Sequence, residues 1–461
     1  MQKNEKTMNP LGYYPIPRLL VTFAIPSVIS MLVNAVYNIV DQIFIGQGIG
    51  YLGNAATTVS FPIVTIILSI GTLLGAGGSS YAAIKLGEKK EEEATKTLCN
   101  VFILLVIAGI LITSFGLLFL DPILNIFGAT PKNMEYSRIY ASIILLGAPF
   151  NLVGIGLSNM ARCDGAPKLA MYSMLAGAIL NTILDPIYIF VFHWGVAGAA
   201  IATITSQLIS TIILVSYFLK HGNMRFQKRW FKIDLNTCRK VFSLGVSSCI
   251  IQISATLMQI VMNNSLVHYG ALSSVGGDVA LSAMGIVSKV SMIITSICIG
   301  IGIGAQPILG FNRGAKKPER ILKTYTIAAS IASVVSCIGL ALCFLFPEQI
   351  LMVFGTQDAK FNEFAKQCMQ IYMLGIFTAG FQITATSYFQ ATGQPLKASI
   401  LSMLRQLILL IPCILILPKF LGLNGILYAG PIADITSGIV VSIFMVKELK
   451  KLKHQISLQE A

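Results

Sequence analysis

Twelve long runs of apolar residues, each long enough to cross a bilayer, take up most of this 461-residue chain. A membrane-spanning helix needs about 20 apolar residues, and the runs are continuous, without the alternation of a membrane β-barrel. Only 11% of the residues are charged, against about 25% in soluble domains. We therefore predict an all-α polytopic membrane protein and exclude a water-soluble globule. The predicted spans are 17–45, 53–84, 92–119, 134–160, 168–192, 196–219, 240–268, 277–310, 323–346, 362–390, 396–417 and 424–446.

Lysine and arginine gather in the loops on one side of these spans. With the N-terminus placed in the cytoplasm, 26 of the 33 Lys and Arg residues lie on the inner side and five lie in outer loops. This bias orients membrane proteins. It predicts a multi-pass membrane protein with both termini cytoplasmic. The same distribution accounts for the net charge of +14, so no nucleic-acid partner is expected.

The two halves of the chain resemble each other at an offset of 227 residues. Gly75–Gly77 aligns with Gly302–Gly304 at this offset. Because six spans is an even number, both halves enter the membrane in the same direction, which predicts a parallel repeat of two six-helix lobes. The predicted divisions are an N-terminal lobe (1–219), a cytoplasmic basic linker (220–239) and a C-terminal lobe (240–461).

Three acidic residues lie well inside the predicted spans: Asp41, Asp185 and Asp434. An ionisable group there costs about 2.5–3.5 kcal/mol on insertion scales and is a functional candidate. Asp41 and Asp185 fall at one depth, about 8–10 Å below the outer surface at 1.5 Å of rise per residue. We therefore predict that they share a site.

Polar residues surround these two acids in the N-terminal lobe. Asn181 lies one turn before Asp185, and Thr203 reaches the same depth from the next span. Asn34, Tyr37 and Asn38 precede Asp41 on its own span, and Asn34, Asn38 and Asp41 share a helical face. Carboxylates in a low dielectric can take up and release a proton, and the same oxygens suit a hard cation such as Na⁺. The alternative is that Asp185 and Pro186 cap or kink a helix and that Asp41 forms only local hydrogen bonds.

The C-terminal lobe carries a different pattern of charge. Arg405 is the expected partner of Asp434, because an unpaired charge in mid-span is costly. We favour a structural or gating ion pair there over substrate binding. The role of Lys289 in the eighth span stays open. Pro26 in the first span is a candidate hinge, and a static kink is equally compatible with it.

Other site classes are not supported by the sequence. There is no phosphate-binding Gly-Lys-Ser/Thr motif, metal-ligand spacing or nucleophile elbow, so neither an enzyme nor a resident cofactor or metal is expected. Nine cysteines lie mostly in apolar runs, which is typical of buried thiols. A cleft for bulky organic cations could be lined by methionine and aromatic residues. The candidates for that lining are Met31, Tyr37, Gln252, Met258, Met284, Met292, Phe381 and Tyr388.

Three stretches of the chain resemble the multidrug and toxic compound extrusion (MATE) family. They are Asn34–Asp41 with Phe44–Gly46, Arg162–Lys168 followed by Asn181–Pro186, and Trp194–Ala200. The resemblance implies secondary active export of diverse organic cations, driven by inward movement of H⁺ or Na⁺. It is greatest to the DinF-like and MepA-like branches, whose coupling site matches Asp41, Asn181, Asp185 and Thr203 and whose bending proline matches Pro26. The NorM-like branch instead carries acids in its C-terminal lobe, and spans 7 and 10 lack them here.

The sequence therefore predicts a multidrug antiporter of a prokaryotic plasma (inner) membrane that functions as a monomer, with small organic cations and the coupling cation as ligands. A lipid or lipid-linked glycan flippase of the same superfamily is the alternative, and it would need a cavity rich in basic residues. An ion channel is disfavoured, because two similar lobes do not create a four- or five-fold pore.

Overall fold

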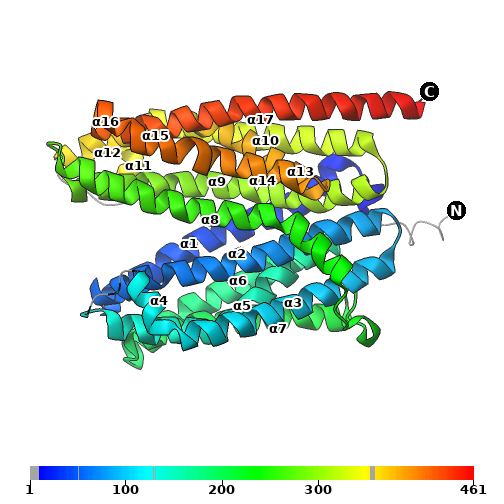
Figure 1. Ribbon diagram of the computed structural model, residues 1–461, viewed down its shortest axis with the longest axis horizontal. Coiled ribbons are helices and arrows are strands. Elements are labelled where there is room, and N and C mark those ends of the chain that lie inside the picture. The colour runs from blue at the N-terminus through cyan, green and yellow to red at the C-terminus, as the bar shows by residue number, and fades with distance from the viewer. Residues whose placement is uncertain (1–9, 50, 128, 130, 354–358, 461) are drawn as a thin grey trace.

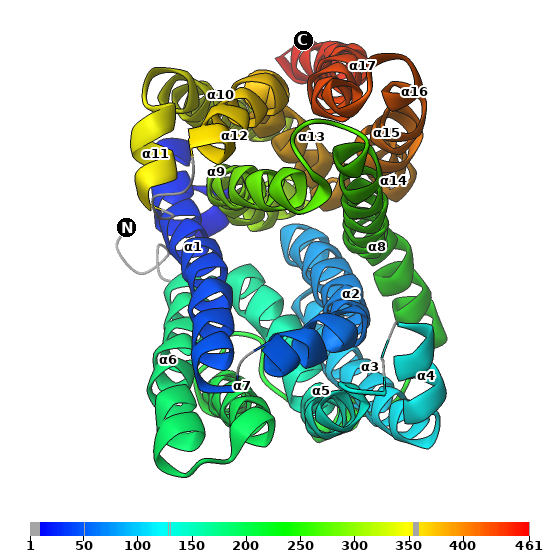
Figure 2. The same ribbon diagram turned by 90° about the vertical axis from the view of Figure 1, so that its left-hand side faces the viewer.

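The computed structural model describes residues 10–49, 51–127, 129, 131–353 and 359–460. All regular elements in these ranges are helical. By length and composition, twelve helical stretches among these described residues could cross a membrane, which confirms the predicted number of spans and the all-α fold class. Figures 1 and 2 show the helices gathered in two bundles that lie side by side.

The N-terminal bundle holds the first six spans. Its elements are η2 (Pro10–Gly12), α1 (Ile16–Ile49), α2 (Tyr51–Gly87), α3 (Glu91–Leu118), α4 (Leu120–Ile126), α5 (Met134–Cys163), α6 (Pro167–Pro186), η3 (Ile187–Val191) and α7 (Gly195–Lys220). The segment that joins the two bundles contains one short 3₁₀ turn, η4 (Lys228–Trp230).

The C-terminal bundle holds the other six spans, two of them interrupted. Its elements are α8 (Leu235–Ala271), α9 (Gly277–Gly314), α10 (Pro318–Leu345), α11 (Pro347–Val353), α12 (Ala359–Tyr372), η5 (Met373–Thr378), α13 (Ala379–Ala391), α14 (Pro395–Met403), η6 (Leu404–Leu410), α15 (Ile411–Ile416), α16 (Pro418–Leu421) and α17 (Leu423–Glu460).

Prolines and wide turns interrupt several spans. The fifth span changes from α-helix to π-helix immediately after Pro186, and the eleventh contains the π-helix η6 just before Pro412. Proline removes a backbone donor and crowds the preceding turn, and π-turns are frequent at functional sites. Both π-helices lie beside a buried acidic side chain, Asp185 in one lobe and Asp434 in the other.

Helix α1 belongs to both bundles. Its first turns bury Ile16, Leu19, Leu20 and Phe23, together with Leu11 of η2, in a hydrophobic cluster whose other buried residues all come from the C-terminal bundle. Its last turns reach the N-terminal bundle, where Ile45 packs with Ile189 and Ala199. A single continuous helix therefore links the core of one lobe to the other.

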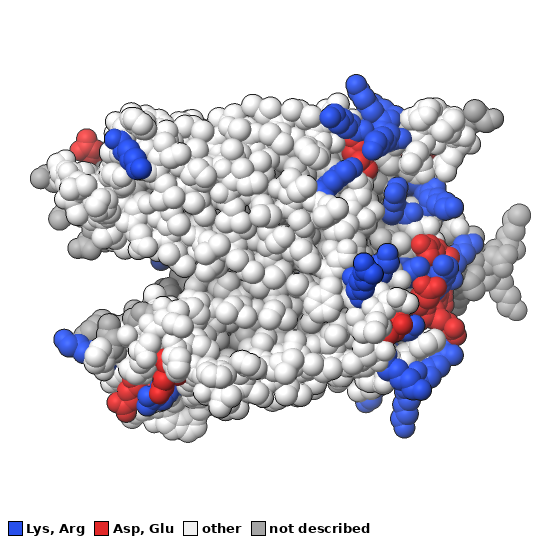
Figure 3. All heavy atoms as spheres, in the orientation of Figure 1, with Lys and Arg blue, Asp and Glu red and all other residues white. Residues whose placement is uncertain are grey.

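The two lobes meet at one end of the molecule, which we call the basic end because Figure 3 shows most of the Lys and Arg side chains of this face gathered there. At the other end, Figure 3 shows a hollow between the lobes. At the basic end Gly87 abuts the backbone of Phe311, and Gly314 abuts the backbone of Ile84. At the 227-residue offset Gly87 corresponds to Gly314 and Ile84 corresponds to Phe311. The two contacts are therefore equivalent, and they lie close to the pseudo-two-fold axis of the repeat.

Candidate functional site

Asp41 and Asp185 come together inside the N-terminal lobe, between α1, α6 and α7. Their carboxyl groups lie within hydrogen-bonding reach of each other. Asp185 is fully buried, with 0% of its surface exposed. Asn181, one turn earlier on α6, is 1% exposed. The structure thus forms a compact pair of acids from two helices that the sequence placed only at a common depth.

Hydrogen bonds join Asn181 to the next turn of α6 and to helix α7. Its Nδ2 donates to Asp185 Oδ1 at 3.3 Å and to Thr203 Oγ1 at 3.4 Å. The Thr203 hydroxyl in turn donates to the Ala199 carbonyl at 3.0 Å. The amide therefore holds the Asp185 carboxyl group in one orientation, facing Asp41.

Three buried oxygens of this cluster have no hydrogen-bond partner within the described ranges. They are Asp41 Oδ1, Asn181 Oδ1 and Asp185 Oδ2. Buried polar atoms are nearly always paired, so a set of acceptors without donors indicates room for a proton or a cation. In the part of the chain that the structure describes, no group of three or more His, Cys, Asp or Glu side chains could hold a metal ion.

Two tyrosines lie beside the carboxyl pair. The Tyr37 hydroxyl lies within hydrogen-bonding reach of the Thr203 side chain, so Tyr37 lies beside the predicted cluster. Tyr140 of α5, which sequence reasoning did not single out, is 7% exposed and lies within electrostatic reach of Asp41 and Asp185. Tyr140 lies six residues from the start of α5, in the fourth span. This depth in the membrane is the sequence signal that could have identified it.

The remaining N-terminal candidates lie along α1. Asn38 Nδ2 donates to the Asn34 carbonyl at 2.6 Å and to its side-chain oxygen at 3.1 Å. Both asparagines are exposed, and their hydrogen bonds do not extend to the carboxyl pair. Pro26 lies inside α1, which continues through it as one helix. Ser30 Oγ donates to the Pro26 carbonyl at 2.8 Å.

In the C-terminal lobe, Arg405 Nε donates to Asp434 Oδ1. The main-chain carbonyl of Asp434 accepts from Thr378 Oγ1 at 3.2 Å and from Gln382 Nε2 at 2.9 Å. Gly375 lies against the Asp434 side chain. Residues of η5, α13, η6 and α17 therefore converge on one ion pair, and the pairing of Arg405 with Asp434 is the one that the sequence predicted.

The prediction that Tyr388 and Met284 line a cleft is wrong, because both side chains are buried. Tyr388 is 1% exposed and packs against Tyr325 with ring centroids 5.2 Å apart. Met284 is also buried, in a core cluster with Val287. Neither side chain can line an open cleft, because each is enclosed by packed neighbours. Lys289 is exposed on α9.

Twelve helices in two lobes, with an acid pair buried inside one of them, define a membrane transporter. The chain belongs to the MatE family, whose model matches residues 26–187 and 248–416, and it is therefore not an enzyme.

A curated relative, the multidrug export protein MepA of Staphylococcus aureus (strain MRSA252), is 27% identical over 424 residues, which is 91% of both chains. The fold is also that of solved transporters. A structure described as the outward-facing conformation of a multidrug resistance MATE family transporter has a TM-score of 0.88 at 24% identity, covering 95% of this chain and 96% of its own. A MOP superfamily transporter from Pyrococcus furiosus has a TM-score of 0.89 at 24% identity, covering 96% and 98%.

Proposed function

We propose that this protein is a monomeric multidrug antiporter that exports small organic cations in exchange for H⁺, using Asp41 and Asp185 as its coupling site. Export of drugs is supported by the relation to the Staphylococcus aureus multidrug export protein. The coupling ion is supported by one observation, the contact between two carboxyl groups in a buried site. Two ionised carboxylates repel each other at such a distance, and one shared proton removes that repulsion.

Na⁺ is the second candidate for the coupling ion. The unpaired oxygens of Asp41, Asn181 and Asp185, together with the Thr203 hydroxyl, form an oxygen donor set of the kind that hard cations prefer. Either ion would neutralise the pair, so the two candidates differ in what drives transport and not in which residues bind.

The coupling site acts on the lobes through α1. Its first half is packed into the C-terminal core through Leu19 and Phe23, and Asp41 in its second half meets Asp185 of the N-terminal lobe. A change in charge at Asp41 alters how strongly this second half is held. Pro26 lies between the two anchored halves and, lacking an N–H, is the position where the helix bends most easily.

The basic end faces the cytoplasm in this proposal, with both termini inside, following the positive-inside rule. The hollow between the lobes (Figure 3) then opens to the outside, and the structure represents the drug-releasing state. A flippase for anionic lipids would need a basic cavity. Arg405 is already neutralised by Asp434, which disfavours that alternative.

The test is efflux of a fluorescent organic cation from proteoliposomes under separate pH and Na⁺ gradients. We expect the pH gradient to drive efflux and Asp41→Asn to abolish it. Asp121→Asn, which alters an exposed aspartate paired with Arg138, is the matched control and should transport normally. Efflux driven only by the Na⁺ gradient would identify Na⁺, and not H⁺, as the coupling ion. Normal gradient-driven efflux by Asp41→Asn would overturn the proposed site, and movement of a labelled lipid without drug efflux would favour the flippase.

A further inference from the structure

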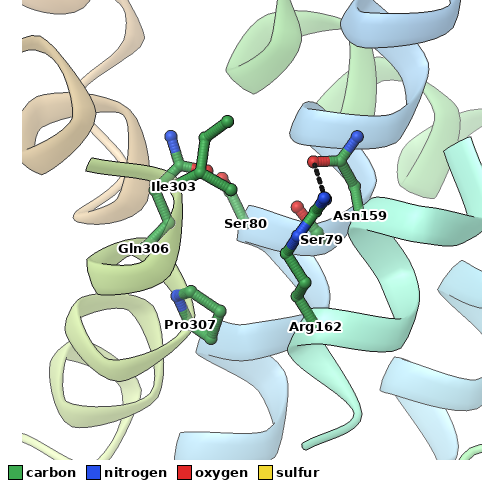
Figure 4. A pocket seen from close by; sticks show the side chains of 7 residues that line it. All are labelled: Ser79, Ser80, Asn159, Arg162, Ile303, Gln306 and Pro307. Carbon is green, nitrogen blue, oxygen red and sulfur yellow. Dashed lines mark hydrogen bonds between the residues drawn. The ribbon is translucent and has the colours of Figure 1, made fainter. Parts of the chain in front are cut away.

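A small polar cavity lies between the lobes near the basic end, far along α2 and α5 from the acid pair (Figure 4). Its volume is about 10 Å³, close to the minimum that holds one water molecule. The lining residues are Ser79 and Ser80 of α2, Asn159 and Arg162 of α5, and Ile303, Gln306 and Pro307 of α9. The cavity is complete only while the two lobes touch, because α9 belongs to the other lobe.

Arg162 is a buried cation with no anionic partner in the structure. It is 4% exposed, and its guanidinium makes one long hydrogen bond, from Nη1 to Asn159 Oδ1 at 3.4 Å. None of the ion pairs among the described residues includes it. A buried charge without a partner is costly, so this guanidinium is strongly disposed to bind an anion.

The nearest acid in sequence, Asp164, cannot serve as that anion. Its Oδ2 accepts from the Tyr217 hydroxyl at 2.7 Å and from Asn223 N at 2.9 Å. Its Oδ1 accepts from Met224 N at 2.8 Å. Both carboxylate oxygens therefore already accept hydrogen bonds from the end of α7 and the segment between the lobes.

A second unsatisfied group lies in the same cavity. Ser80 is 2% exposed, and its hydroxyl has no hydrogen-bond partner within the described part of the chain. Across the interface, Gln306 Nε2 donates one hydrogen to Gln390 Oε1 at 3.3 Å, which leaves its second N–H available. Ser80 from one lobe and Gln306 from the other therefore line the same cavity as the guanidinium, and hydrogen-bond donors beside a positive charge recognise an anion.

Only one of the two internal repeats supplies a charged residue at this position. Arg162 corresponds to Gln390 at an offset of 228, and Ser79 corresponds to Gln306 at 227. The cavity thus lies close to the pseudo-two-fold axis, where the two repeats contribute equivalent positions. Only the N-terminal repeat supplies a cation, so the site carries one uncompensated positive charge.

We propose that this cavity binds a small monovalent anion, chloride, held by Arg162, Ser80 and the Gln306 amide. Because both lobes contribute, the anion binds only the conformation whose basic end is closed. By linkage, binding must stabilise that conformation. Chloride is thus a ligand of the closed cytoplasmic side and is separate from the exported cation and from the coupling ion.

The test uses purified full-length protein in detergent, with chloride exchanged for gluconate at constant pH and ionic strength. We expect the thermal midpoint Tm to rise by a few degrees with chloride and to saturate. Arg162→Gln should lose this rise. The matched control Arg229→Gln alters an exposed arginine paired with Glu92 and should keep it. Crystals grown in bromide should show an anomalous peak beside Arg162.

Two further variants keep the test decisive if Arg162→Gln folds poorly. Arg162→Lys retains the charge and should keep a Tm rise that needs a higher chloride concentration. Ser80→Ala should also weaken the chloride response without removing it. A wild-type Tm that does not differ between chloride and gluconate, a response that survives in Arg162→Gln, or bromide crystals with no peak at the cavity would overturn the proposal in favour of a water-filled cavity.

Discussion

Arg405 and Asp434 neutralise each other inside the C-terminal lobe. Only 7% of the Asp434 side chain is exposed, so removing its partner leaves a buried, uncompensated charge. We expect Arg405→Met to lower the free energy of unfolding by about 3–5 kcal/mol. The double variant Arg405→Met/Asp434→Asn removes both charges and should recover most of that loss. Thermal unfolding followed by tryptophan fluorescence measures both effects, and equal stability of the single variant and the wild type would contradict this account.

At the same scale, the sequence and the structure agree on which residues are unusual. The acids of the N-terminal lobe stand out because the cost of a charge in a bilayer depends on the residue and its depth alone. Tyr140 does not stand out, because a tyrosine carries no such cost. Its role follows only from the packing of α5 beside Asp41 and Asp185.

At the scale of the elements, α1 and α9 approach closely through glycine. A Cβ atom on Gly304 would lie 2.6 Å from the Ala24 Cα atom, so α1 would have to shift. We expect Gly304→Ala to cost about 1–3 kcal/mol of stability through overpacking and to reduce efflux, because α1 links the lobes. Gly285→Ala on the same helix is the control, since no heavy atom lies within 4 Å of a Cβ built there. Identical behaviour of the two variants in unfolding and efflux assays would contradict the proposed role of this contact.

The start of α8 depends on one capping residue outside the membrane-spanning segment. Asp234 accepts from the Thr237 hydroxyl at 2.6 Å and from Thr237 N at 3.1 Å, and it pairs with Lys96 at 3.0 Å. The hydrogen bonds from Thr237, and then the contact with Lys96, lower the pKa of Asp234. The folded chain therefore prefers the ionised form, and this stabilisation is present above the ordinary pKa of about 4 and is lost as the pH falls below it.

We accordingly expect Asp234→Ala to cost about 1 kcal/mol at neutral pH. The difference from the wild type should shrink as the pH falls from 5 through the ordinary pKa of about 4 and below, because the unfolded chain then binds a proton that the folded chain, with its lowered pKa, does not. Thermal unfolding across that range measures it. Glu92→Ala, which alters an exposed ion pair with Arg229, serves as a control with little expected effect. A difference that stays constant with pH would show that the charge of Asp234 does not contribute.

At the scale of the whole molecule, the distribution of basic side chains predicts the orientation in the membrane. Lys132 and Lys228 are exposed at opposite ends. In a variant with the exposed Cys337 replaced by serine, Lys132→Cys should react with a membrane-impermeant maleimide in intact cells. Lys228→Cys should react only after the cells are permeabilised. The reverse pattern would invert the proposed orientation and make the hollow face inward.

The sequence by itself determined the helical fold, the twelve spans and the repeat, because insertion energies are local and add residue by residue along the chain. It also predicted that Asp41 and Asp185 share a depth and that Arg405 pairs with Asp434. Only the tertiary structure decided that α1 belongs to both lobes, that Tyr388 is enclosed and that Arg162 lies unpaired between the repeats. These facts depend on which helices face one another, and side-chain neighbours across helices follow from packing and not from depth.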